Sequence, residues 1–169
     1  MELEERVAEL ERRTAALERA GAAGSASPTV GEADFWALEG LKQQLAGAGA
    51  DDGGVLFTGA VRLPTGERYE WQIGAGTEDL LEDDWSGAAD TFAALGHPVR
   101  LRLLREIIGG RRTAAALSEL EDLGTTGQIY HHLRQLTAAG WLHTTGRGRY
   151  EVPGIRVVPL LVVLTAARP

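Results

Sequence analysis

The stretch TTGQIYHHLRQLTAAGWL, Thr125 to Leu142, combines a helix-start signal with polar side chains that can contact nucleic acid. Thr125 and Gln128 form a T-x-x-Q capping box, which predicts that a helix begins at Thr126. Successive residues of a helix turn by about 100°, so the apolar residues fall on one side and form a predicted buried stripe: Ile129, Leu133 and Leu136. The opposite side carries a polar set: Gly127, Gln128, His131, Arg134 and Gln135.

This polar set matches what a helix in the DNA major groove needs. Arginine pairs with guanine and glutamine with adenine, and a glycine near the helix start lets the backbone come close. The predicted base-reading residues are Gly127, Gln128, His131 and Arg134. Hydroxyls and free N–H groups at a helix start hold phosphate, which assigns backbone contacts to Thr125 and Thr126, with Tyr130 on the flank. The alternative is an ordinary solvated face, and from this helix alone the two interpretations are evenly balanced.

The adjacent histidines do not form an evident metal site. His131 points outward and His132 lies beside the apolar stripe, so the two side chains face about 100° apart and cannot readily chelate one ion. The chain has no cysteine, which excludes disulfides and thiolate metal ligands. We therefore expect no metal and no cofactor.

The flanking sequence predicts the elements that position this helix. Thr113 is expected to cap a short helix over residues 114–120, which makes a helix-turn-helix with the helix from Thr126. Residues 141–144 and 149–152 are predicted to form two strands joined by a turn. The arginines at this turn, Arg147 and Arg149, are expected to lie along a phosphate backbone or to reach into a minor groove. Upstream, residues 89–95 form one predicted helix and Pro98 opens another that ends at Gly109-Gly110. This order predicts a winged helix-turn-helix domain over residues 85–169.

The segments FAALGHPVRLRLLREIIGG, TTGQIYHHLRQLTAAGWL and GRGRYEV closely resemble the ArsR family of bacterial winged-helix transcriptional regulators, over roughly residues 90–169. The resemblance implies a homodimer that binds an inverted-repeat operator, with the first and last helices of the domain forming the dimer. Here the last helix would span residues 156–167 with Pro159 in its first turn, and its apolar surface would include Val157, Leu160, Leu161 and Leu164. One departure is that this helix has no histidine and the chain no cysteine, so the metal-sensing ligands of many members are missing.

The region before this domain has three predicted parts. Residues 1–20 show a short heptad seam, formed by Leu3, Val7, Leu10 and Leu17. We favour a dimeric coiled coil over an amphipathic helix that packs on its own domain. Residues 21–31, rich in Gly, Ala, Ser and Pro, are a predicted linker.

Residues 32–84 form a predicted accessory module of a helix, residues 32–45, and a β-hairpin. The hairpin reads VLFTGAVRL, PTGE, RYEWQI, with an apolar face that includes Phe57, Tyr69 and Trp71. A lone hairpin is marginal in water, so it must pack on the preceding helix or on a second copy. We favour a structural role for this face over a pocket for a small-molecule or protein effector.

Charge divides the chain in two. Residues 1–84 hold 7 basic and 18 acidic residues, a net charge of −11, and residues 85–169 hold 10 basic and 6 acidic, a net charge of +4. No nucleophile elbow, P-loop or dinucleotide fingerprint occurs, so an enzyme is not expected. No signal peptide or apolar run of membrane-spanning length occurs either, which favours the cytoplasm, at the nucleoid.

The sequence thus predicts an α+β protein: a mainly helical winged helix-turn-helix domain, preceded by a short coiled-coil helix and a helix plus β-hairpin module. The predicted function is sequence-specific DNA binding by a homodimeric transcriptional regulator, a repressor, on an inverted repeat. The alternative is a winged-helix interaction module whose protein partner binds the acidic N-terminal half.

Overall fold

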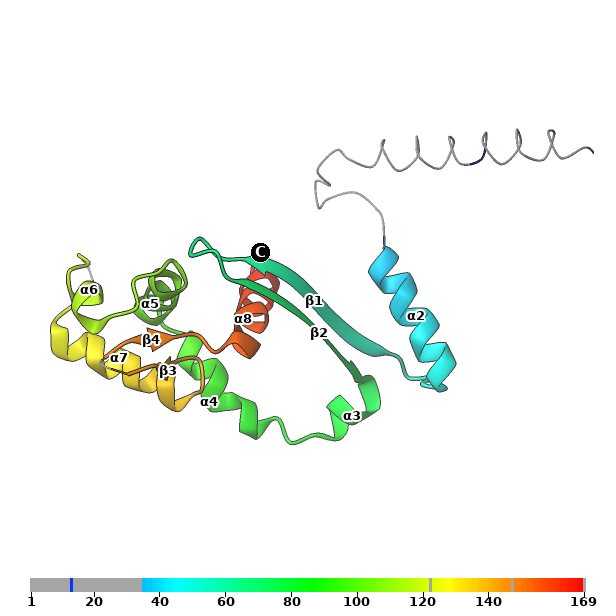
Figure 1. Ribbon diagram of the computed structural model, residues 1–169. Coiled ribbons are helices and arrows are strands. Elements are labelled where there is room, and N and C mark those ends of the chain that lie inside the picture. Colours follow the sequence, from blue (N-terminus) through cyan, green and yellow to red (C-terminus); the bar gives the residue numbers. More distant parts are fainter. Residues whose placement is uncertain (1–12, 14–34, 122, 147, 169) are drawn as a thin grey trace, which may run out of the picture. The chain divides into compact units, whose positions relative to one another are not determined.

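A computed structural model describes Arg13 and residues 35–121, 123–146 and 148–168 (Figure 1). The chain forms two compact units, Met1–Glu39 and Gly40–Pro169. The predicted linker, residues 21–31, lies outside the described residues, and so do the predicted coiled-coil contacts: Leu3, Val7, Leu10 and Leu17. Arg13 is helical, and helix α2, Trp36–Ala48, begins in the first unit and ends in the second. This helix was expected over residues 32–45, and it continues to Ala48.

The predicted hairpin is confirmed. Strands β1, Gly54–Arg62, and β2, Arg68–Gly76, pair antiparallel with Phe57 opposite Ile73 and Val61 opposite Tyr69. Alternate residues of a strand share a face, so the odd-numbered residues of both strands form one mostly apolar face.

The last helix, α8, Gly154–Ala166, packs on one half of that face. A Cβ atom on Gly59 would lie 2.7 Å from Val158 Cγ1, and a Cβ atom on Gly154 would lie 3.1 Å from Tyr69 Cε1. A side chain at position 59 would therefore push the hairpin and α8 apart, whereas one at position 154 would need Tyr69 to move by a few tenths of an ångström. The hairpin therefore belongs to the same compact unit as the C-terminal helices, and the expected boundary between residues 84 and 85 falls inside this unit.

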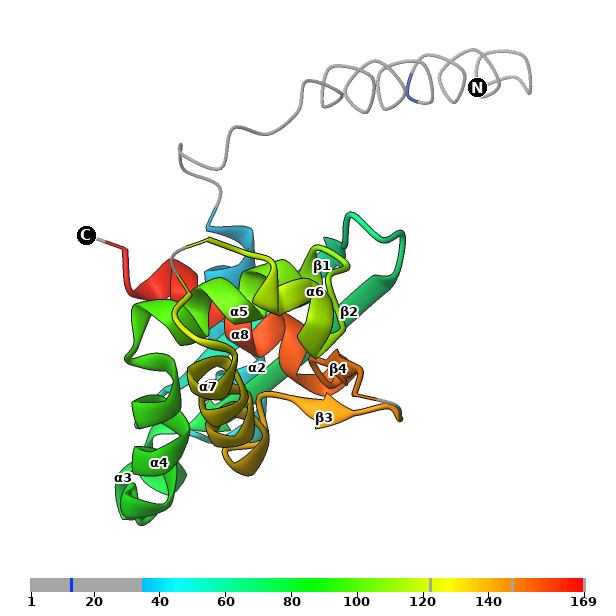
Figure 2. The ribbon, with the colours of Figure 1, turned by 90° about the vertical axis from the view of Figure 1, so that its left-hand side faces the viewer.

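The remaining elements follow the predicted order of a winged helix-turn-helix (Figure 2). The short acidic helix α3, Thr77–Glu82, follows β2 directly. Then come α4, Ser86–Leu95; α5, Pro98–Ile108; α6, Ala114–Ser118; α7, Thr126–Ala138; β3, His143–Thr144; and β4, Tyr150–Glu151. Strands β3 and β4 are shorter than the sequence predicts.

One apolar core joins these elements. It draws side chains from the helices, the wing and the end of the hairpin: Leu63, Leu103, Leu104, Ile107, Leu117, Ile129, Leu133, Leu136, Trp141, Val157 and Leu160. Trp141 is 2% exposed, its Nε1 donates to the Thr91 carbonyl at 2.9 Å, and the Arg156 guanidinium lies 5.1 Å from its ring centroid. The core therefore spans residues more than ninety positions apart in the sequence.

Two expectations about α8 need correction. The helix begins at Gly154, so Pro159 lies in its interior and not in its first turn. Val157 and Leu160 are 1% and 0% exposed within a single chain, so they belong to the core and cannot form the expected dimer surface. Leu161 is half-buried and Leu164 is 36% exposed, which leaves these two on the accessible side.

Candidate nucleic-acid interface

Hydrogen bonds between residues close in sequence define the start of α7. Thr125 has extended backbone, and its side chain accepts from the Gln128 N–H while Gln128 Oε1 accepts from the Thr125 N–H at 2.8 Å. This is the predicted capping box, and the helix begins at Thr126 as predicted. Among the described residues, the N–H groups of Thr126 and Gly127 have no acceptor, as expected in a first helical turn. They can donate to an anion such as a phosphate.

The end of α7 is equally well defined. Gly140 has a φ of 74°, its N–H donates to the Thr137 carbonyl at 3.1 Å, and the Trp141 N–H donates to the Leu136 carbonyl at 2.9 Å. This is a Schellman motif, which needs a left-handed residue after the helix. The buried Trp141 side chain then anchors the chain as it leaves for the wing.

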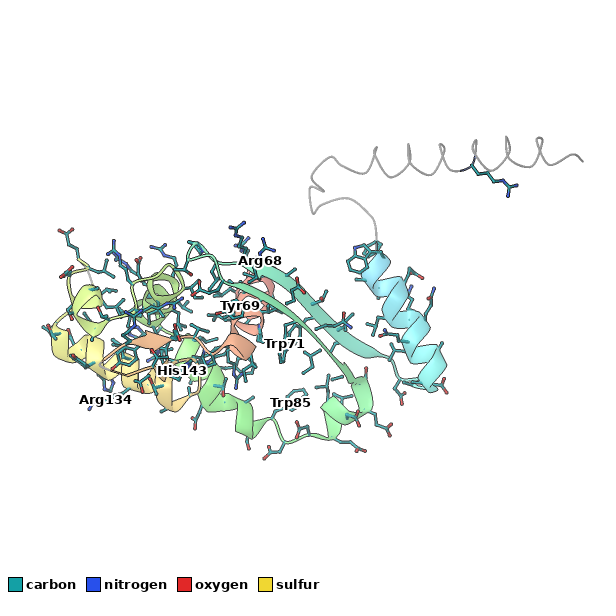
Figure 3. All side chains as sticks on the ribbon, viewed as in Figure 1. Arg68, Tyr69, Trp71, Trp85, Arg134 and His143 are labelled. Carbon is teal, nitrogen blue, oxygen red and sulfur yellow. The ribbon has the colours of Figure 1, made fainter. Side chains whose placement is uncertain are left out.

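The faces of α7 are those that the sequence predicts. Ile129, Leu133 and Leu136 are each 0% exposed. The polar set is exposed on the other side: Thr125, Thr126, Gly127, Gln128, Tyr130, His131, Arg134 and Gln135. Within the described part of the chain, Arg134 has no hydrogen bond or ion pair, so its guanidinium is free for an external acceptor (Figure 3).

Two glutamines on this face are less free than the sequence suggested. Gln128 Oε1 accepts hydrogen bonds within the capping box, and only the amide NH2 group of Gln128 remains available. A two-point contact with adenine would therefore require the capping box to open. Gln135 Oε1 accepts from Arg100 Nη1 at 2.6 Å. The accessible hydrogen-bonding face therefore centres on His131 and Arg134.

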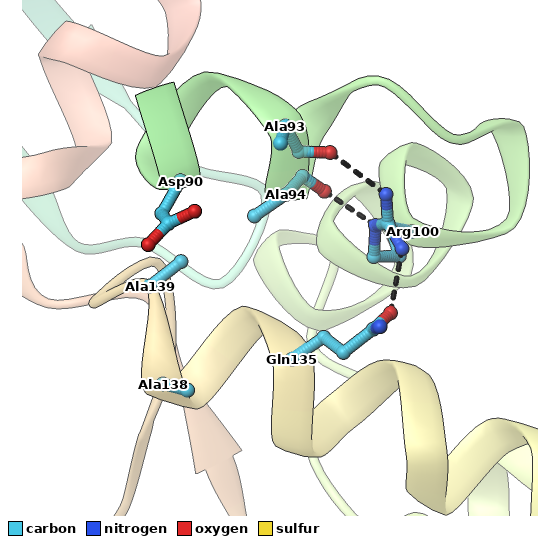
Figure 4. A pocket seen from close by; sticks show the side chains of 7 residues that line it. All are labelled: Asp90, Ala93, Ala94, Arg100, Gln135, Ala138 and Ala139. Atoms are coloured by element: carbon cyan, nitrogen blue, oxygen red, sulfur yellow. Dashed lines mark hydrogen bonds between the residues drawn. The ribbon is translucent and has the colours of Figure 1, made fainter. Parts of the chain in front are cut away.

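Arg100 is a positioning residue that sequence reasoning missed. It donates to the Ala93 carbonyl at 2.8 Å, to the Ala94 carbonyl and to Gln135, which joins the end of α4 to α7 (Figure 4). The same figure shows a shallow pocket beside this contact, lined by Asp90, Ala93, Ala94, Arg100, Gln135, Ala138 and Ala139. No local pattern links Arg100 to Gln135, because thirty-five positions separate them.

The histidines form a contact that sequence spacing does not reveal. The His97 and His132 rings lie 4.7 Å apart between centroids, and the His131 and His132 rings 5.7 Å. His97 also caps α5, since its Nδ1 accepts from the Val99 N–H at 3.2 Å. Burial lowers the pKa of His132 below its ordinary value, helped by the nearby His97, Arg100 and His131. His132 is therefore a packing residue that favours the neutral form, as its predicted place at the core edge suggests.

The wing extends beyond its two short strands. Thr113 bridges to Arg149, and the Tyr150 N–H donates to the Arg112 carbonyl at 2.7 Å, so a third segment of chain runs beside β4. Arg149 is exposed, whereas Arg147 lies outside the described residues. Arg112 then links the wing to the hairpin, because its guanidinium donates both to Glu151 on β4 and to Glu67 in the β1–β2 turn.

The hairpin aromatics have different environments. Tyr69 packs against the core and Phe57 is half-buried, while Trp71 is 38% exposed. Among the described residues, no group of three or more His, Cys, Asp or Glu could hold a metal ion. In the same residues, no helix is long and apolar enough to cross a membrane.

Comparison with known proteins agrees with this geometry. Residues 95–144, from the end of α4 to the end of β3, match a protein-family model described as a helix-turn-helix domain. A search of curated proteins and a search of solved structures each gave no match. The matched segment contains α5, α6 and α7, so the exposed polar face belongs to the second helix of the helix-turn-helix. In such domains this helix enters the DNA major groove.

Proposed function

We propose that this chain is a sequence-specific DNA-binding transcriptional regulator related to the ArsR family. It acts as a homodimeric repressor on an inverted-repeat operator, in the cytoplasm at the nucleoid. One observation carries the proposal: the helix-turn-helix segment presents, on α7, an exposed polar face beside unpaired first-turn N–H groups.

In this proposal the two kinds of contact come from different parts of the surface. Arg134, His131 and the Gln128 amide group contact base edges. Gly127 has no side chain, so the helix backbone can come close to the DNA. Thr125, Thr126 and Tyr130, together with wing residues Arg147 and Arg149, contact phosphates and fix the register.

The uneven distribution of charge along the chain supports DNA binding by its C-terminal half. The segment that carries α7 and the wing has a net charge of +4, and the preceding 84 residues have −11. DNA is therefore attracted to one part of the chain and repelled by the other. Binding should weaken steeply with salt, because each neutralised phosphate releases counterions.

Two copies would place two α7 helices one turn of DNA apart, about 34–36 Å, which is why the operator should be a pseudo-palindrome. Occupancy of such a site would block transcription from an overlapping promoter. An effector that bound the hairpin would reach the wing through Glu67, Arg112 and Glu151.

The test is selection of bound duplexes from a random DNA library by the full chain, with Arg134→Ala in parallel. The matched control is Arg105→Ala, an exposed arginine on α5 whose side chain is 76% exposed. We expect an enriched inverted repeat for the full chain and the control. Affinity for that repeat should fall roughly 5- to 150-fold in Arg134→Ala, the value of one good arginine–guanine pair. No enrichment, or equal affinity of Arg134→Ala, would reject the proposal and favour a protein partner.

A further inference from the structure

The exposed polar face of α7 has few hydrogen-bond acceptors. Helix α7, which is described throughout, contains no Asp or Glu, so its two glutamines are the side chains that carry a carbonyl oxygen. Adenine and cytosine each present an amino group in the major groove, and an amino group needs an acceptor. The state of the two glutamine oxygens therefore decides which bases this face can recognise.

The oxygen of Gln128 is fully engaged within the chain. Gln128 Oε1 accepts from the Thr125 N–H at 2.8 Å and from the Thr125 hydroxyl at 3.2 Å. An amide oxygen has two lone pairs, so these two hydrogen bonds occupy both of its acceptor positions. The Gln128 side chain can therefore only donate to DNA while the capping box is intact.

The oxygen of Gln135 is engaged by a charged partner. Gln135 Oε1 accepts from Arg100 Nη1 at 2.6 Å, and the same guanidinium is fixed by the carbonyls of Ala93 and Ala94 (Figure 4). Hydrogen bonds to a charged donor are stronger than those between neutral groups. A glutamine pairs with adenine through its oxygen and its NH2 group together. Both glutamines of α7 would have to break a contact of the fold to make that pair.

The side chains that remain free on this face are donors. Arg134 has five N–H donors, and among the residues that the structure describes it has no hydrogen bond or ion pair. His131 is exposed, and an imidazole donates from at least one nitrogen in either protonation state. The two residues are three positions apart on one side of the helix, which separates them by about 4.5 Å along its axis. This is close to the roughly 3.4 Å between successive base pairs.

We propose that each operator half-site carries guanines at the two neighbouring base pairs that Arg134 and His131 contact. Guanine is the base whose major-groove edge presents two acceptors, N7 and O6, and no donor. Arg134 donates to both acceptors of one guanine, and His131 donates to an acceptor of the next. The inference rests on the proposed function and adds to it the chemistry of the recognised bases. The capping box and Arg100 contribute to specificity, because they occupy the oxygens that adenine would need.

The first test compares the motifs that the full chain and Arg134→Gln select from a random duplex library. The full chain should select two adjacent guanines in each half of the enriched repeat. A glutamine at position 134 lies outside the capping box, so Arg134→Gln should change one of these guanines to adenine and keep the other. The control Arg105→Ala should select the same motif as the full chain.

The outcomes of this test separate the two proposals. An enriched repeat without adjacent guanines, or an unchanged guanine in Arg134→Gln, overturns the assignment of guanine and leaves sequence-specific DNA binding intact. No enriched sequence for the full chain overturns both proposals. Circular dichroism checks that each variant is folded.

The second test changes single atoms of the selected duplex, with affinity measured by fluorescence anisotropy at one fixed salt concentration. Replacing the guanine assigned to Arg134 by 7-deazaguanine removes N7 and should weaken binding by roughly fivefold or more. Hypoxanthine at the same position is the matched control, because it keeps N7 and O6 and lacks only the minor-groove amino group, and it should change affinity little. The 7-deazaguanine duplex should bind Arg134→Ala as tightly as the guanine duplex does, since the contact is already lost. Equal losses from both analogues, or an undiminished loss in Arg134→Ala, overturn the contact between Arg134 and guanine.

Discussion

Arg112, which precedes α6, donates through Nη2 to Glu67 in the hairpin turn at a distance of 2.5 Å. The other arm of the same guanidinium donates to Glu151 on β4. The Arg112 side chain is only 15% exposed, so these two charge-assisted contacts are partly shielded from water. A single side chain therefore holds together the accessory hairpin and the wing.

Replacing Arg112 with Met should lower the free energy of unfolding by about 1.5–3 kcal/mol, since it removes hydrogen bonds between charged groups and leaves two carboxylates without their cation. Urea unfolding measures this effect. Arg111→Met is the matched control, because that neighbouring side chain is 54% exposed and meets Glu106 only at 3.7 Å. Equal losses in both variants would show that the Arg112 contacts add nothing beyond an exposed ion pair.

Acid should release the same contact. Hydrogen bonds from Thr65 and Arg112 lower the pKa of Glu67 from 4.5 to about 2. A carboxylate with a depressed folded pKa contributes stability above its unfolded pKa and loses it as pH falls through the folded value. We therefore expect Glu67→Gln to destabilise the protein at pH 6 and to have a progressively smaller effect between pH 4.5 and pH 2. Thermal unfolding across this range measures it, and a difference that stays constant with pH would contradict the ionic account.

His132 should make stability pH-dependent near neutrality. Its folded pKa lies below the ordinary value of 6.5, so the unfolded chain binds more protons near and below that pH. Stability should then fall as pH drops from 7.5 toward 5.5. In His132→Gln this part of the dependence should be reduced, which melting temperatures at several pH values would reveal. A slope that is unchanged in His132→Gln would show that this histidine is not the cause.

Gly59 should be sensitive to a single methyl group. In Gly59→Ala the new Cβ would meet Val158 Cγ1 at 2.7 Å, which forces α8 and the hairpin apart. Overpacking of this kind costs about 1–3 kcal/mol. Adding Val158→Ala should recover part of the loss, because it removes the methyl group in conflict. Additive losses in the double variant, measured by urea unfolding, would argue against this contact as the cause.

Gln128 has a structural role and a proposed DNA role that can be separated. Gln128→Ala removes one half of the capping box and should cost about 0.5–2 kcal/mol of stability. Gln128→Glu keeps an acceptor for the Thr125 N–H and adds a negative charge at a helix start, so stability should be kept. It loses the amide donors and repels phosphate, so duplex binding should weaken. Fluorescence anisotropy with a selected duplex reports this, and unchanged binding would leave Gln128 as a cap alone.

Much of α7 is predictable from nearby residues. The capping box fixes its start, the apolar spacing fixes its buried side, and Gly140 supplies the turn that ends it. Such features depend on hydrogen bonds and side-chain directions within a few positions, which the local sequence encodes. The hairpin register is local in the same sense, because one short turn sets it.

The tertiary structure decided which apolar surface is core. The pattern of α8 shows that Val157, Leu160, Leu161 and Leu164 are apolar, but only packing places Val157 and Leu160 inside one chain. The sequence pattern likewise did not predict contacts between residues far apart along the chain: His97 with His132, Arg100 with Gln135 and Arg112 with Glu67. The physical reason is that burial and pairing across elements depend on how whole elements pack, whereas helix starts and strand faces depend on neighbours along the chain. The sequence by itself therefore determined the candidate DNA-reading face. The fold determined which side chains of that face remain free to contact DNA.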